Sequence, residues 1–184
     1  MRRSPTTLRK VVARLGILLG ALAIVAATPT PCRAASYSGS LAQPGVVWIS
    51  DDSKPAPLPE SEMRNTRKSF VPDLLVITAG SSVRFPNDDS FFHSVYSENG
   101  PDSFDIGFYD NGPGKLVAFP KPGVVLLRCH IHGTMHATIV VVDGPWAQTH
   151  AADEKYTLTN VRTGSHILHT WSADGGEQTR SVNV

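Results

Sequence analysis

Cysteine is scarce in this chain of 184 residues, which contains only Cys32 and Cys129. Cys32 lies in an N-terminal segment that we expect to be removed, so Cys129 would remain alone. A lone cysteine cannot form an internal disulfide, and a free thiol in an oxidising compartment is a liability unless something occupies it. A bound metal ion is the occupant that we expect.

Several other patterns are missing. No long helical periodicity runs through the sequence, which argues against a helical fold. A Ser-His-Asp arrangement, an HExxH motif and a phosphate-binding glycine loop are also absent. The chain has seven histidines, too few in suitable places for an enzyme with several metal centres. The sequence therefore predicts a protein that is not an enzyme.

The N-terminal segment has the composition of a secretory signal peptide. Its start is basic and without acids, an apolar run covers residues 15–27, and small residues lead to Ala34. The apolar run is shorter than a permanent membrane span requires. We expect residues 1–34 to be cleaved and the mature protein to be periplasmic. An uncut N-terminal anchor is the alternative.

Cleavage after Ala34 would change the charge balance. It removes six of the 17 Lys and Arg and none of the 16 Asp and Glu, which leaves a net charge near −5. An acidic protein is a poor partner for nucleic acid and for anionic membranes, so we expect neither. The roughly 150 residues that remain suffice for one packed domain with a small addition, which we expect to be monomeric.

Short runs rich in Val, Ile and Phe, separated by Gly, Pro and Asn turns, predict strands. These runs cover residues 45–50, 73–79, 82–87, 115–120, 123–129 and 137–143. Residues 51–69 are polar and Pro-rich and predict a long loop. Many short strands at this spacing predict an all-β fold, a Greek-key β-sandwich or barrel, over residues 35–143. Three further strand-like pieces predict a short C-terminal β extension or small β module over residues 144–184.

Metal-binding side chains gather where one predicted strand ends. Cys129 closes an apolar strand, and His132 and Met135 follow, each after a gap of two residues. A tight loop on a rigid sandwich can direct a thiolate, an imidazole and a thioether at one centre, and this donor set suits copper. His93 is the candidate for the second imidazole. The prediction is a trigonal group of His93, Cys129 and His132, with Met135 as a weak axial ligand.

These residues resemble the plastocyanin and amicyanin branch of the cupredoxins. The matching pieces are residues 71–89, His93, and residues 119–143. The Cys-x-x-His-x-x-Met spacing of residues 129, 132 and 135 is that of amicyanins. Residues 104–109 and the pattern Asn160-Val161…Gly164…Trp171 are similar to plastocyanin-like proteins labelled as methylamine-utilisation proteins. The resemblance implies a cupredoxin-like fold with one type 1 (blue) copper ion.

Two positions differ from the family pattern. Ser94 stands where Asn often follows the first histidine ligand, and His130 stands where Ser or Thr often follows the cysteine. A hydroxyl at position 94 could still brace the ligand loop. His130 and His136 lie close to the predicted ligands in sequence, so a more open site that includes an extra imidazole is the alternative.

The function expected from the copper site is the transfer of single electrons between redox partners. A periplasmic dehydrogenase and a c-type cytochrome are the partners that the amicyanin-like spacing implies. One alternative is a periplasmic copper chaperone or storage protein, which the extra histidines would favour. Another is a non-redox β-sandwich binding module in which the metal is structural.

Overall fold

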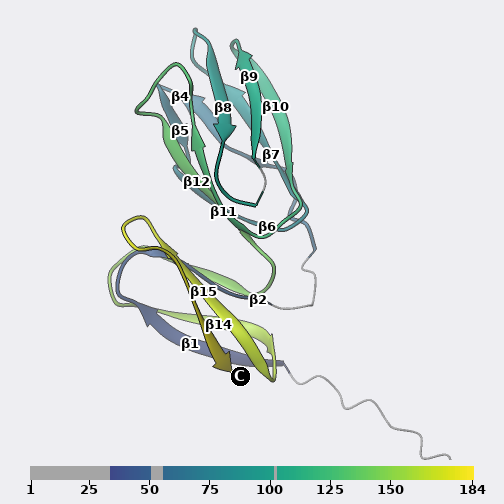
Figure 1. The fold of residues 1–184 in the computed structure, drawn as a ribbon, viewed down its shortest axis with the longest axis vertical. Helices are drawn as coiled ribbons and strands as arrows, with labels where there is room; N and C mark the ends of the chain where they lie inside the picture. The colour runs from purple at the N-terminus through teal and green to yellow at the C-terminus, as the bar shows by residue number, and fades with distance from the viewer. Residues whose placement is uncertain (1–33, 51–55, 102) are drawn as a thin grey trace, which may run out of the picture. The chain divides into compact units, whose positions relative to one another are not determined.

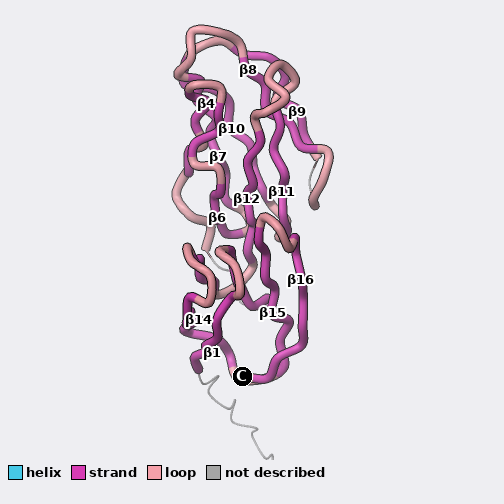
Figure 2. The backbone as a smooth tube through the Cα atoms, turned by 90° about the vertical axis from the view of Figure 1, so that its left-hand side faces the viewer, coloured by secondary structure: helices cyan, strands magenta, loops and turns pink. Residues whose placement is uncertain are grey.

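The computed structural model describes residues 34–50, 56–101 and 103–184, and their regular structure consists of strands (Figures 1 and 2). No helix in these residues is long and apolar enough to cross a membrane. The predicted signal peptide lies outside the described residues except for Ala34, which begins the first strand. The all-β prediction is confirmed.

Two five-stranded sheets form the region that carries the predicted metal ligands. The first sheet has the strand order β6 (Leu74–Thr78), β12 (His136–Val142), β11 (Gly123–Arg128), β8 (His93–Ser97) and β9 (Phe104–Tyr109). The second has the order β10 (Gly112–Phe119), β7 (Ser81–Asn87), β4 (Arg64–Thr66) and β5 (Ser69–Val71), with β3 (Ser61–Glu62) also paired to β7.

The chain passes repeatedly from one of these sheets to the other. It changes sheet between β6 and β7, between β7 and β8, and again on both sides of β10. The buried side chains of both sheets form one apolar core. Its members include Phe70, Ile77, Val83, Phe85, Phe119, Leu127 and Ile139. This arrangement agrees with the cupredoxin-like Greek-key β-sandwich that the sequence predicts.

The prediction for residues 51–69 was wrong in part. Residues 51–55 lie outside the described residues, but β3, β4 and the start of β5 fall within the expected loop. Polar strands of two or three residues carry too little periodicity for a sequence pattern to reveal them. β3 and β4 pair with β7, and β5 pairs with β4; these pairings supply the stability that such short strands lack alone.

A second group of strands joins the first described residues to the C-terminal part of the chain. β1 (Ala34–Leu41) pairs with β14 (Glu154–Arg162). A four-stranded sheet has the order β13 (Trp146–Thr149), β2 (Gly45–Ser50), β15 (Ser165–Ser172) and β16 (Gly176–Asn183). The expected division at residue 143 assigned β1 and β2 to the metal-binding domain, whereas their hydrogen-bonded neighbours all follow residue 143.

Two strands are apolar on both faces because each lies between two apolar clusters. In β2, Val47 and Ile49 pack in one cluster, while Val46 and Trp48 pack in another. In β12, Ile139 and Val141 face the sandwich core, while Val140 and Val142 join the cluster of Val46 and Trp48. Burial on both faces explains why these two runs show no alternation of apolar and polar residues.

A polar network surrounds Ser50 at the end of β2. The hydroxyl of Ser50 donates a hydrogen bond of 2.9 Å to Asp143 Oδ1 and lies 2.8 Å from His169 Nε2. The other nitrogen of His169 lies 3.0 Å from Glu177 Oε1, and its ring stacks on Trp48 with centroids 4.7 Å apart. This network gives His169 a structural role between Ser50 and Glu177.

Replacing Ser50 with Ala should destabilise the protein. It leaves two partly buried polar groups without a shared partner, which costs about 1–3 kcal/mol in the free energy of unfolding. Ser38→Ala is the matched control, because Ser38 makes only an exposed hydrogen bond with Thr157 and should change stability by less than about 0.5 kcal/mol. Urea denaturation of both variants measures the difference. Equal stability of the two would show that the network contributes little.

Candidate metal centre

The four predicted ligands lie on neighbouring parts of one sheet. His93 begins β8, Cys129 directly follows β11, and His132 and Met135 lie in the loop before β12. β8 and β11 are antiparallel neighbours, with Arg128 paired to Tyr96. This pairing brings a histidine 36 residues earlier in the chain beside the cysteine.

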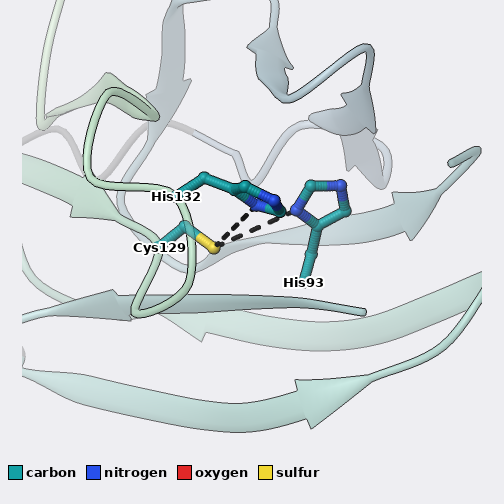
Figure 3. A group of neighbouring side chains, drawn as sticks. All are labelled: His93, Cys129 and His132. Carbon is teal, nitrogen blue, oxygen red and sulfur yellow. Dashed lines mark hydrogen bonds between the residues drawn. The ribbon is translucent and has the colours of Figure 1, made fainter. Parts of the chain in front are cut away.

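His93, Cys129 and His132 form one compact group (Figure 3). The sulfur of Cys129 lies 4.0 Å from Nδ1 of His93 and 4.0 Å from Nδ1 of His132. All three ligand atoms lie within 4.8 Å of one another. Cys129 is 4% exposed, His93 is fully buried and His132 is half-buried, so the group opens to solvent on the side of His132.

Met135 lies in the same core as Cys129 and is 2% exposed. Its backbone N–H donates a hydrogen bond of 2.9 Å to the carbonyl of His132, which closes a tight turn. The turn keeps the loop short enough for both residues to remain beside the cysteine. Met135 as an axial ligand stays a prediction that this burial supports.

Asp89 determines which nitrogen of His93 is available. Nε2 of His93 lies 2.8 Å from Asp89 Oδ2, so it carries the proton and donates to the carboxylate. Nδ1 is then left with a free lone pair on the side of Cys129, as a metal ligand requires. Asp89 also accepts hydrogen bonds from the backbone N–H groups of Arg67 and Lys68, at 2.7 and 3.0 Å. Burial raises the pKa of Asp89, but these donors outweigh it and hold the pKa below its usual range.

Ser94 braces the ligand loop through its hydroxyl. The hydroxyl accepts a hydrogen bond of 2.8 Å from the backbone N–H of His130 and donates to the sulfur of Cys129 at 3.7 Å. It therefore links β8 to the loop after β11. The serine at this position fulfils the bracing role that the resemblance implied for an asparagine.

The thiol of Cys129 is acidic. Burial by itself raises the pKa of Cys129, but donors around the sulfur outweigh burial and lower the pKa from 9.0 to about 6. These donors are the backbone N–H groups of Ser94, His132 and Ile131. The thiolate, which is the form that binds metals, is thus favoured at neutral pH.

The two additional histidines of the loop lie outside the group. Nε2 of His130 lies 2.9 Å from Asp105 Oδ2, and its ring stacks on Tyr96 with centroids 3.9 Å apart. His136 is exposed and pairs with Arg128 at the start of β12. In the described part of the chain, the one cluster of potential metal ligands is that of His93, Cys129 and His132. The alternative with an extra imidazole therefore finds no support in the geometry.

The group fits a copper ion. A first-row metal bonds imidazole nitrogen at about 2.0 Å and thiolate sulfur at about 2.3 Å. One ion can therefore bind a sulfur and a nitrogen that lie up to about 4.3 Å apart. The sulfur of Cys129 lies 4.0 Å from each of the two Nδ1 atoms, which is within that limit. A soft thiolate with two imidazoles and a neighbouring thioether is the donor set that copper prefers in electron-transfer sites.

No family model and no curated protein matches the chain. Parts of it are similar to solved copper proteins. The copper-containing nitrite reductase of Thermus scotoductus SA-01 is 30% identical, with 46% of this chain and 22% of that chain covered and a TM-score of 0.43. Amicyanin of Paracoccus versutus is 18% identical, with 52% and 96% covered and a TM-score of 0.42. A purple cupredoxin of Nitrosopumilus maritimus is 22% identical, with 44% and 98% covered and a TM-score of 0.40. The methylamine-utilisation group stays a prediction.

The metal-free protein should lose stability as the pH falls. Because folding lowers the pKa of Cys129 from 9.0 to about 6, its thiolate contributes stability that is complete above pH 9 and lost as the pH falls through 6. We expect the free energy of unfolding, measured by urea titration with a chelator present, to decrease over this range. In Cys129→Ser this part of the decrease should vanish. The same pH dependence in both proteins would contradict the assignment of an acidic thiol.

Proposed function

We propose that this protein is a mononuclear type 1 copper protein that carries single electrons between redox partners. The observation that carries the proposal is the buried group of one acidic thiol and two imidazoles within 4.8 Å of one another. His93, Cys129 and His132 would hold the ion, and Met135 would add a weaker thioether donor. Bound there, copper supplies one-electron chemistry between Cu(I) and Cu(II).

The protein contributes rigidity at the site. Cys129 and His93 lie at the ends of paired strands, and Ser94 and Asp89 hold their side chains through hydrogen bonds. Side chains that are fixed in this way move little when the charge of a bound ion changes. Fast electron transfer requires that the ligands rearrange little. The rigidity of this site therefore favours the role of an electron carrier.

The surface beside His132 suits a transient partner. His132 is half-buried, and the exposed apolar side chains of Phe91 and Ile131 flank it. Small, partly apolar contacts are typical of redox encounters, which must form and separate quickly. A reduced partner would donate one electron here and an oxidised partner would withdraw it, with no covalent bond made or broken.

The proposal extends to the cellular setting. The basic and apolar N-terminus indicates export to the periplasm, and the amicyanin-like ligand spacing suggests a dehydrogenase as donor and a c-type cytochrome as acceptor. We propose a soluble monomer without nucleic-acid or membrane partners after cleavage. A copper chaperone or storage protein is the second candidate, but the histidines that favoured it, His130 and His136, lie outside the ligand group. The third candidate is a non-redox binding module in which the metal is structural. In that case Cys129→Ser would destabilise the protein without removing its binding function.

Addition of one equivalent of Cu(II) to residues 35–184 tests the metal site. We expect an intense visible absorption from thiolate-to-copper charge transfer and a narrow copper hyperfine splitting in the EPR spectrum. Both should be lost in Cys129→Ser, because the thiolate supplies the covalency. His136→Ala is the control and should retain both signals. A weak, tetragonal spectrum that survives the cysteine substitution would favour a copper chaperone or storage protein.

Replacing Met135 with Leu should raise the reduction potential of the copper-loaded protein. Leucine removes one electron-pair donor while preserving the apolar surroundings, and the loss of a donor destabilises the more highly charged Cu(II) more than Cu(I). Voltammetry of the two proteins measures the change. A potential that is unchanged or lower in the variant would mean that Met135 is a core residue and not a ligand.

A further inference from the structure

Phe91 occupies the side of the site that faces solvent. Its ring centroid lies 5.2 Å from that of His93 and 5.5 Å from that of His132, and the two imidazoles lie 4.9 Å from each other. The three rings are thus mutually in contact. Phe91 is 37% exposed and His93 is fully buried, so the phenyl ring lies between one imidazole and the solvent.

The backbone of Phe91 is held in place. The side-chain amide of Asn87, which is buried, donates a hydrogen bond of 2.9 Å to the carbonyl of Phe91. Its oxygen accepts from the backbone N–H of Asp89 at 3.0 Å, and Asn111 donates to the carbonyls of Asn87 and Asp89. A loop with this many hydrogen bonds presents the ring in one position.

Lys68 completes the support of the ring. Its ammonium lies 5.5 Å from the centroid of Phe91, within the range of a cation–π contact. The turn that carries Lys68 is anchored by Asp89, the same carboxylate that binds His93. Asp89 therefore anchors both the predicted ligand His93 and the turn whose lysine contacts the ring of Phe91.

We propose that Phe91 is the entrance residue of the metal site, and that it excludes water and small anions from the space between Cys129, His93 and His132. This inference rests on the proposed function and adds to it. An electron carrier needs no exogenous ligand, and a closed site keeps the ion from binding one. A metal-transport or catalytic site would instead need an open coordination position. Phe91 is therefore a specificity-determining residue.

Reactivity of the Cys129 thiol in the metal-free protein tests the entrance without any copper. We expect Phe91→Ala to accelerate alkylation by iodoacetamide about tenfold or more at fixed pH, since the reagent no longer waits for the ring to move. Phe92→Ala is the matched control, because Phe92 is the adjacent phenylalanine and is more exposed, at 55%. It should change the rate less than about twofold. Phe91→Leu should lie between wild type and Phe91→Ala.

Azide added to the copper-loaded proteins gives the second readout. The spectrum of the wild type and of Phe92→Ala should not respond, whereas Phe91→Ala should show a new azide-to-copper band. Equal alkylation rates in wild type and Phe91→Ala would overturn the entrance role, as would equal acceleration by both alanine variants, which would indicate a loosened loop. Absence of the thiolate-to-copper band in the wild type would instead overturn the proposed function. The alkylation rates, which need no copper, would then still decide whether Phe91 controls access to Cys129.

Discussion

The pairing of β8 with β11 is the constraint on which the site depends. It places the first residue of one strand beside the residue that follows the other, so His93 and Cys129 meet although 36 residues separate them. The apolar core beneath these strands holds the pairing, because Val95 and Leu127 are both fully buried in it. Local flexibility in the loop that carries His132 is limited by its own tight turn. The ligand atoms are therefore placed by the sandwich before any ion binds.

Hydrogen bonds around the site then set its chemistry. Ser94 and the backbone N–H groups near the sulfur favour the thiolate, and Asp89 leaves Nδ1 of His93 free to bind a metal. These groups come from different strands and turns, so they act together only in the folded chain. The same carboxylate of Asp89 links the ligand to the hairpin of β4 and β5. Stability of that hairpin and orientation of the ligand are consequently coupled.

Much of the fold could be predicted from the sequence. The runs that became β2, β6, β7, β10, β11 and β12 contain Val, Ile, Leu and Phe and end at turn residues. The strands β3 and β4 could not be found, because they are short and polar and form only by pairing with β7. The partners of β1 and β2 were also not predictable. Their hydrogen-bonded neighbours lie about 100 residues or more later in the chain, and strand pattern alone carries no information on pairing over such a distance.

For the site, the sequence by itself determined the donor types and their spacing in the loop: Cys129, His132 and Met135 lie within seven residues, where chain geometry alone keeps them close. It also indicated His93 as the second imidazole. The tertiary structure decided the rest. It directed His130 toward Asp105 and away from the ligand group, assigned the bracing role to Ser94, and placed Phe91 over both imidazoles. These outcomes depend on contacts between strands that are distant in sequence, and such contacts are established only when the sandwich closes around its core.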